Sequence, residues 1–130
     1  MNAIILFAHG SRDPLWRTPI EAVAQRIRAL RPQRLVQCAY LELCEPDLPK
    51  VAIDLIAACA YSTALNGKNT LKIRIIPMFL GMGKHAREDL PRLVQKLRTD
   101  HPSVEFDIVP PIGEDVRVTA LLAQLALAEE

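Results

Sequence analysis

The chain has 130 residues, of which 50% are hydrophobic and 24% are charged, and this composition suits one globular domain over residues 1–130. It contains no run of about 18 apolar residues, so we expect no membrane span. The formal net charge of +1 excludes a general electrostatic attraction to nucleic acid. Binding of an anionic ligand therefore requires positively charged side chains close to its site.

The cysteines and the first residues point to a cellular compartment. Cys38, Cys44 and Cys59 are an odd number without a CxxC pair, which favours neither a disulfide framework nor a zinc ribbon. We expect buried thiols at these positions. The chain enters an apolar strand at once and leaves no room for a signal peptide, so a cytoplasmic location is predicted.

The first third of the chain alternates between strand and helix patterns. A continuous apolar run over residues 4–8 is typical of a strand covered on both faces, and such strands belong to parallel sheets flanked by helices. Thr18 and Glu21 predict a capping box at the start of a first helix, which Pro32 closes. A second strand is expected at 35–40.

The same alternation continues to the end of the chain. Asp47 can cap a second helix, and residues 66–67 mark its exit. A third apolar strand over 71–78 leads through a glycine loop into a third helix. That helix is expected to begin near His85, because Pro91 is tolerable only in a first turn.

The remaining segments define the fold class. Residues 104–109 alternate and contain two acids, which indicates an edge strand, and an alanine- and leucine-rich helix is expected over 116–128. The order βαβαβαβα with short connections implies right-handed crossovers and a four-stranded parallel sheet in an α/β fold. Because so small a sheet leaves an exposed edge and apolar helices, we expect pairing into a homodimer.

Two histidines follow two apolar strands at what should be one edge of the sheet. His9 ends the first strand, and His85 follows the third. Two imidazoles suit borderline divalent metals such as iron, cobalt, nickel or zinc, and they can also accept protons. Each could instead hydrogen-bond only within its own turn. His101, at the end of the third helix, is expected to be structural.

Carboxylates near the same edge could assist these histidines. Glu42 leaves the second strand, next to the first, so it could act as a base or ligand beside His9, or be a solvated turn residue. Glu88 lies three residues beyond His85, where an acid also suits the helix dipole. The other acids near this edge are Asp13, Glu45 and Asp89.

The loop over residues 81–86 fits the pattern G-x-G-x-x-A of dinucleotide-binding proteins, so a nucleotide-binding oxidoreductase is one alternative. Its place on the third strand argues against that reading, as do bulky residues where a pyrophosphate would approach. Arg12, Lys84 and Arg87 flank the histidine loops and could bind carboxylates or phosphates, or simply be solvated.

Residues 8–14, 40–46 and 77–91 resemble the signatures of short sirohydrochlorin chelatases, which are class II tetrapyrrole chelatases. The resemblance covers nearly the whole chain. It implies a flavodoxin-like three-layer fold, a homodimer, and ATP-independent insertion of cobalt or ferrous iron into sirohydrochlorin for cobalamin or sirohaem synthesis. It also implies that His9 and His85 hold the metal, with Glu42 as a helper.

The resemblance further implies no permanently bound cofactor, because the divalent metal, Co²⁺ or Fe²⁺ with Ni²⁺ as a further candidate, is a substrate. The pyrrole protons are then taken up by one of the histidines or by Glu42. The expected contacts to the tetrapyrrole are Ser11, Arg12, Leu80, Gly81, Met82, Gly83, Lys84 and Arg87. The chain departs from the family pattern over residues 82–84. A metal-carrier or sensor domain without turnover is the alternative outside enzymology.

Overall fold

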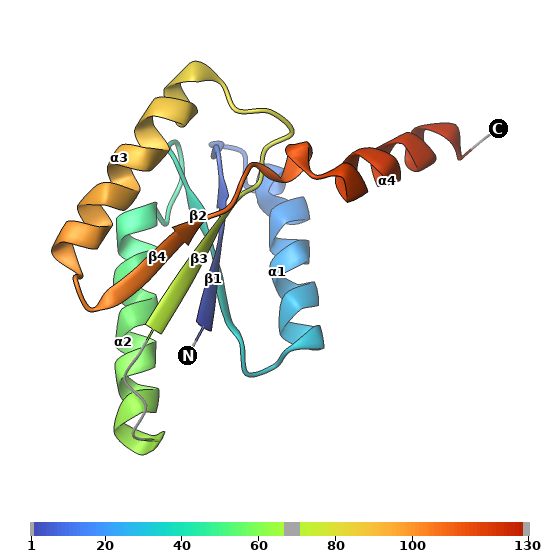
Figure 1. The fold of residues 1–130 in the computed structure, drawn as a ribbon. Coiled ribbons are helices and arrows are strands. Elements are labelled where there is room, and N and C mark those ends of the chain that lie inside the picture. The colour runs from blue at the N-terminus through green and yellow to red at the C-terminus, as the bar shows by residue number, and fades with distance from the viewer. Residues whose placement is uncertain (1, 67–70, 129–130) are drawn as a thin grey trace.

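The computed structural model describes residues 2–66 and 71–128 and contains one sheet of four parallel strands in the order β2-β1-β3-β4 (Figure 1). The strands are β1 (Asn2–Ala8), β2 (Leu35–Tyr40), β3 (Leu71–Pro77) and β4 (Val104–Ile108). The predicted α/β fold is confirmed, and β4 lies at an edge of the sheet as expected.

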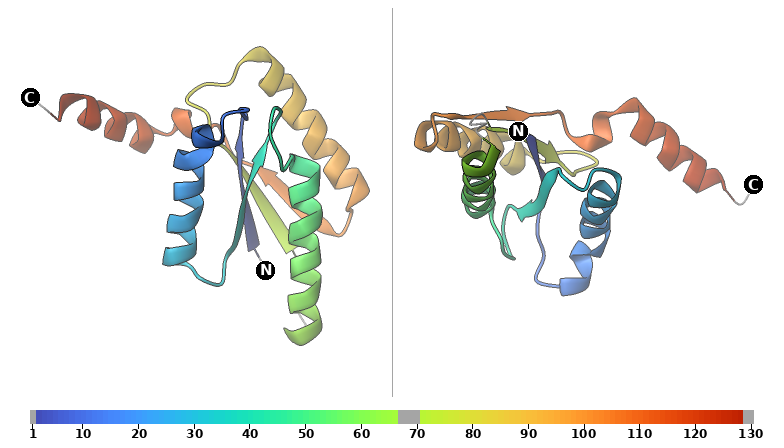
Figure 2. Two further views of the ribbon diagram at one scale, coloured as in Figure 1. Left: turned by 180° about the vertical axis from the view of Figure 1, so that it is seen from behind. Right: turned by 90° about the horizontal axis from the view of Figure 1, so that it is seen from below.

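Helices follow each strand along the chain. They are α1 (Thr18–Leu30), α2 (Leu48–Asn66), α3 (Lys84–Asp100) and α4 (Val116–Leu127), with the short 3-10 helices η1 (Pro14–Arg17) and η2 (Ile112–Glu114). Figures 1 and 2 show α2 and α3 against one face of the sheet and α1 against the other, which gives three layers. The helix α4 projects away from these layers. None of the described helices is long and apolar enough to cross a bilayer.

The core lies mainly between the sheet and the helices α2 and α3. Ile73 and Ile75 of β3 are fully buried there, together with Phe7 of β1. From the helices, Val51 and Val94 are buried against them. A second, smaller cluster lies under α1. Because β1 is therefore covered on both faces, its sequence has to be apolar throughout.

The start of α1 differs from the predicted capping box. The helix η1 runs directly into α1, and Thr18 has helical backbone angles (φ −53°, ψ −47°) in place of the extended conformation of an N-cap. Asp13 caps η1 instead, where its Oδ1 accepts a hydrogen bond from the Leu15 backbone N at 2.9 Å. The prediction of a box at Thr18 and Glu21 is therefore wrong.

The helix α3 begins beside His85 as expected, but Pro91 lies inside the helix and not in its first turn. Because proline has no N–H, the carbonyl of Arg87 lacks its usual helical donor. Burial of Leu90, Val94 and other residues on the inner face of α3 compensates for this loss.

The second helix starts as predicted. The Asp47 Oδ1 accepts a hydrogen bond from the Lys50 backbone N at 3.0 Å, which caps α2. The helix ends at Asn66, and the expected exit residue Gly67 lies outside the described residues. Cys59 is buried in α2, as the sequence suggested for the cysteines.

The other two cysteines, Cys38 and Cys44, are only half-buried. Burial raises the pKa of the Cys38 thiol, and the negative charge of Glu21 raises it further. This thiol is therefore mostly protonated, which fits a packing role and not a nucleophilic one.

Candidate functional site

Three strands deliver the candidate site residues to the carboxyl edge of the sheet. His9 follows β1, Glu42 lies two residues beyond β2, and His85 stands in the first turn of α3, after β3. The carboxyl edge of an open α/β sheet is the usual place for a ligand, because the loops diverge there.

Backbone hydrogen bonds join the loops that follow β1 and β2. The Leu41 N–H donates to the carbonyl of Ala8 at 2.9 Å, and the Glu42 N–H donates to the carbonyl of His9 at 3.0 Å. Gly10 has a φ of +106°, and a Cβ added there would overlap the carbonyl oxygen of Glu42. Glycine is therefore required for this close approach of the two loops.

A cavity of about 540 Å³ opens at this edge. Its volume falls within the range of small-molecule sites. The residues around it come from the loops after β1, β2 and β3 and from the first turns of α3: they are His9, Leu41, Glu42, Phe79, Gly81, Gly83, Lys84, His85, Ala86 and Asp89. The two histidines and Glu42 thus share one cavity.

The ring of His9 is held between a carboxylate and an aromatic side chain. His9 Nδ1 lies 3.7 Å from Glu42 Oε1, and both side chains are 56% exposed. The rings of His9 and Phe79 meet edge to face, with centroids 6.4 Å apart. A carboxylate beside one imidazole nitrogen orients the ring and leaves the other nitrogen available to a ligand.

The cavity does not contain a closed metal cage. Among the described residues, no group of three or more histidine, cysteine, aspartate or glutamate side chains is arranged to hold a metal ion. The cavity offers two imidazoles with Glu42 and Asp89 nearby. Such a set suits a metal that is bound briefly and handed on, because a structural site closes its coordination sphere.

Several of the predicted substrate contacts lie outside this cavity. Ser11 Oγ accepts a hydrogen bond from the Asp13 backbone N at 3.1 Å, and Arg12 is exposed in the same loop. Leu80 is exposed beside the cavity. Their part in binding the tetrapyrrole remains a prediction.

Met82 and Arg87 line a neighbouring cavity of about 400 Å³, between α3 and the segment that leads to α4. Met82 lies in the same loop, and Arg87 in the same helix, as residues of the histidine cavity. Their contacts to the tetrapyrrole also remain predictions. Lys84, Gly81 and Gly83 line the histidine cavity, and their contacts to the tetrapyrrole stay predictions.

The sequence reasoning did not select Leu41, Phe79 or Ala86 as site residues, although all three line the cavity. The available signals were their positions in the sequence: Leu41 directly follows β2, Phe79 lies just after β3, and Ala86 follows His85. Asp89 was noted only as a nearby acid. It lies four residues beyond His85, so the helical repeat brings both to one face of α3.

The fold and this cavity define a flavodoxin-like α/β domain with a histidine-lined site at the carboxyl edge of its parallel sheet. The model of the CbiX family matches residues 3–128, and the chain belongs to this family.

Two relatives illustrate the sequence likeness. A sirohydrochlorin cobaltochelatase from Methanopyrus kandleri is 30% identical over 94 residues, which are 72% of this chain and 59% of the relative. A sirohydrochlorin cobaltochelatase from Saccharolobus solfataricus is 27% identical over 130 residues, covering 95% of this chain and 92% of the relative. The chain therefore spans about nine tenths of the length of some relatives and about three fifths of others.

Two solved structures share the fold. The CbiX protein of Marinobacter aquaeolei VT8 matches with a TM-score of 0.71 and 27% identity, over 99% of this chain and 97% of that chain. The sirohydrochlorin chelatase SirB from Bacillus subtilis, solved in complex with cobalt, matches with a TM-score of 0.70 and 24% identity. That match covers 96% of this chain and 50% of SirB, so the SirB chain is about twice the length of the matched part.

Proposed function

We propose that this chain is a sirohydrochlorin chelatase, which inserts Co²⁺ or Fe²⁺ into sirohydrochlorin without ATP, in cobalamin or sirohaem synthesis. The observation that carries the proposal is the convergence of His9, His85 and Glu42 on one open cavity in a member of the CbiX family. Relatives named sirohydrochlorin cobaltochelatase support cobalt as one of the metals.

The two histidines receive the metal in this proposal. Nδ1 of His9 faces Glu42, so the other nitrogen, Nε2, is the donor that can reach into the cavity. His85 supplies a second imidazole from α3. Because few ligands hold the ion, its remaining coordination positions stay open to the pyrrole nitrogens as they replace water.

Insertion also releases two protons, since each of two pyrrole N–H groups must lose its proton before both nitrogens bind the metal. One of the histidines or Glu42 takes them up. The closeness of Glu42 and His9 supports the pair as the acceptor, because a carboxylate stabilises the imidazolium that forms once His9 Nε2 has released the metal to the tetrapyrrole. The protons then pass from this half-exposed pair to water.

The tetrapyrrole has to be held at its edge while its ring bends toward the metal. Sirohydrochlorin carries many carboxylates, and Lys84 lines the cavity where it can meet one of them. Contacts far from the reacting nitrogens can supply the energy for bending. Arg12, in the loop after β1, and Arg87, on α3, are the further candidates.

Other parts of the proposal concern the whole protein. Residues 1–130 form one chelatase domain, which the single sheet and the family match over 3–128 support. A homodimer and a cytoplasmic location stay predictions, as does the absence of a nucleic-acid partner. Nickel remains a further candidate metal.

The proposal is tested anaerobically, by mixing the protein with sirohydrochlorin and Co²⁺ or Fe²⁺ and following the absorbance of the tetrapyrrole. We expect metal insertion well above the rate without enzyme, and a large loss in His9→Ala and in His85→Ala. His101→Ala is the matched control, because this histidine lies at the far end of α3 against Phe106. Equal rates with and without the wild-type protein would contradict the proposal.

Titration calorimetry separates the two alternatives. A metal carrier would bind cobalt stoichiometrically, lose this binding in His9→Ala, and show no affinity for the tetrapyrrole. A nucleotide-binding oxidoreductase would bind a dinucleotide at the loop over 81–86. The family match favours the chelatase over both.

A further inference from the structure

The strand β2 forms one edge of the sheet, and its backbone groups alternate between β1 and this free edge. Just beyond the strand, the Leu41 N–H donates to the carbonyl of Ala8 on β1, so the odd-numbered residues of β2 face β1. The backbone N–H and C=O groups of Val36, Cys38 and Tyr40 therefore point outward. Such an edge can pair with another extended segment.

Two of these three outward positions are already occupied. The Arg28 guanidinium of α1 donates from Nη2 to the Val36 carbonyl at 2.7 Å. The Tyr40 N–H donates to the Pro46 carbonyl at 2.9 Å. Among the described residues, none donates to or accepts from the backbone N–H and C=O of Cys38. The free edge is thus open at one residue and closed on both sides of it.

A groove of about 280 Å³ lies at this open position, between β2 and α1. It is lined by residues of both elements and by one residue that follows β2: they are Glu21, Ala24, Gln25, Arg28, Gln37, Cys38, Tyr40 and Pro46. None of these residues lines the histidine cavity. The groove is therefore a separate place for a ligand.

The helix α1 runs in the opposite direction to β2. The Cys38 thiol donates to the Ile20 carbonyl near the start of α1, at 3.8 Å, whereas Arg28 near the end of the helix reaches Val36 near the start of the strand. The first turns of α1 therefore lie beside the end of β2, and its last turns lie beside the start of β2.

Opposite charges mark the two ends of the groove. Glu21 and Arg28 are seven residues apart, so they stand on one flank of α1 and about 10.5 Å apart along its axis. Burial raises the pKa of the Cys38 thiol; the charge of Glu21 raises it further, and the charge of Arg28 lowers it. Both charges thus lie close to the open position at Cys38.

Tyr40 lies at the negative end of the groove. The residue is only 1% exposed, and its hydroxyl has no hydrogen-bond partner among the described residues. Burial, together with the charges of Cys38 and Glu21, raises the pKa of Tyr40 to about 12, so the hydroxyl stays neutral. A buried hydroxyl without a partner marks incomplete polar packing at this end of the groove.

We propose that this groove binds a peptide of about three residues with free ends, extended along β2 and antiparallel to it. The ammonium group of the peptide faces Glu21. Its carboxylate faces Arg28, which uses only one of its five N–H donors on Val36. Three extended residues span about 10 Å, which matches the separation of the two charges.

The backbone of the peptide meets the one open position of the edge. In an antiparallel pair, two opposite residues exchange both of their N–H···O bonds. The middle residue of the peptide therefore donates to the Cys38 carbonyl and accepts from the Cys38 N–H. A longer strand, including β2 of a second copy, is excluded because Arg28 and Pro46 occupy the neighbouring edge positions.

The site does not depend on the proposed metal chemistry, because its test measures peptide binding and not turnover. The probe is tri-alanine, titrated into nitrogen-15-labelled protein and followed by proton–nitrogen NMR. We expect a saturable shift of the Cys38 amide resonance below about 10 mM peptide. No saturable shift, or a shift centred on His85 in the histidine cavity, would overturn the proposal.

Modified peptides test the two kinds of contact without altering the protein. Methylation of the middle nitrogen removes the donor to the Cys38 carbonyl, and acetylation with amidation removes both terminal charges. Each change should weaken binding at least about 10-fold, because it leaves a polar group of the groove without its partner. Equal affinities for the three peptides would contradict the assigned pairing.

Variants of α1 test the charged ends. Glu21→Gln and Arg28→Gln should each weaken the binding of tri-alanine at least about 10-fold. Arg26→Gln is the matched control, since Arg26 is an exposed residue of the same helix that does not line the groove. The Arg28 variant also loses its bond to Val36, so the Glu21 variant provides the cleaner comparison. Equal affinities in the Glu21 and Arg26 variants would overturn the proposal.

Discussion

His9 and Glu42 come from different strands and meet because the loops that carry them are bonded to each other. The backbone hydrogen bond from Glu42 to His9 sets the spacing of the loops, and the side chains then approach to 3.7 Å. The backbone thus determines where the Glu42 carboxylate lies relative to the His9 ring.

We predict that Glu42→Gln lowers the affinity for Co²⁺ about 10-fold, the lower end of what the loss of such an orienting partner costs. The amide keeps the size of the side chain but removes the negative charge beside His9 Nδ1. Calorimetric titration of the apoprotein measures the effect. Glu45→Gln is the control, since this exposed acid does not line the cavity. Equal losses in the two variants would show a general charge effect.

Gly10→Ala should destabilise the fold by at least about 2 kcal/mol, because alanine at a φ of +106° is strained and its Cβ would overlap the Glu42 carbonyl. The free energy of unfolding in urea measures this effect. A Cβ at Gly81 meets nothing within 4 Å, so Gly81→Ala should change the stability by no more than about 0.5 kcal/mol. A Gly10 variant as stable as the Gly81 variant would contradict the assigned backbone approach.

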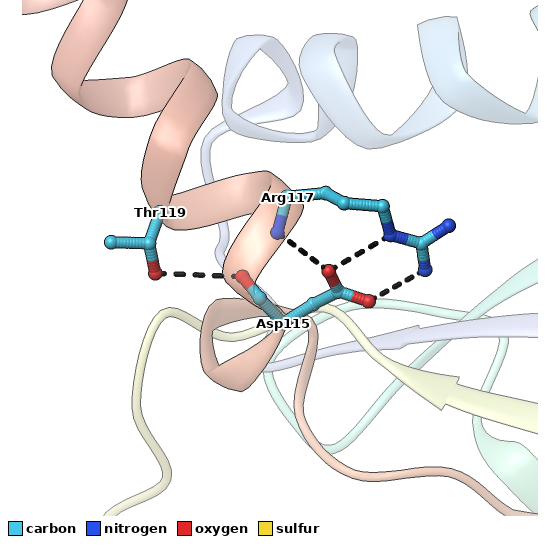
Figure 3. Close-up of polar contacts among 3 residues, drawn as sticks. All are labelled: Asp115, Arg117 and Thr119. Atoms are coloured by element: carbon cyan, nitrogen blue, oxygen red, sulfur yellow. Dashed lines mark hydrogen bonds and ion pairs between the residues drawn. The ribbon is translucent and has the colours of Figure 1, made fainter.

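Among the elements, α4 has none of its residues buried, and local contacts of Asp115 hold its first turn. The Asp115 carboxylate accepts two side-chain hydrogen bonds from Arg117, at 3.0 and 2.7 Å, and one from the backbone N of the same residue (Figure 3). Thr119 Oγ1 also donates to the Asp115 carbonyl at 3.4 Å. These contacts lie within the start of α4 itself, and the helix is attached to the body by the hydrogen bond from the Gly113 N–H to the Phe79 carbonyl.

The hydrogen bonds from the Arg117 side chain and backbone lower the pKa of Asp115 to about 2. Because this pKa lies below the usual value near 4, the carboxylate stabilises the cap fully above about pH 4. That contribution is lost as the pH falls through about 2. A carbon-13 NMR titration of the Asp115 carboxyl should give a midpoint near 2, and Arg117→Gln should raise it toward 4. A wild-type midpoint near 4 would contradict the cap geometry.

The whole molecule is an α/β layer structure in which the last helix, α4, has none of its residues buried. Exposure of Leu121, Leu122 and Leu125 is costly in a monomer, since this apolar area stays in contact with water. The homodimer expected from the sequence would bury the exposed leucines of α4. Such a dimer would also make the stability of the fold depend on protein concentration.

We therefore expect the melting temperature to rise by about 3 °C for each tenfold increase in protein concentration, because a tenfold change is worth about 1.4 kcal/mol for a folded dimer that unfolds to two chains. Differential scanning calorimetry over a hundredfold range checks this. The variant with Leu122→Asp and Leu125→Asp should melt at a temperature independent of concentration. A constant melting temperature in the wild type would contradict a folded dimer.

Much of the fold was predictable because it depends on local pattern. The continuous apolar run that ends at His9 is readable as a strand buried on both faces, and the acid at position 47 is readable as a cap. The parallel order follows from the alternation of strands and helices. The carboxyl ends of such strands share one edge of the sheet, which is why the sequence alone predicts His9, Glu42 and His85 in one site.

Other features depend on contacts between residues far apart in the chain and were not readable. The helical backbone of Thr18 results from η1 running into α1, and Pro91 is tolerated inside α3 because the inner face of the helix is buried. Phe79 enters the cavity through its packing against His9. The outward direction of α4 is set by hydrogen bonds and close contacts that join its root to the loop after β3, and no periodicity of the residues within α4 encodes these contacts.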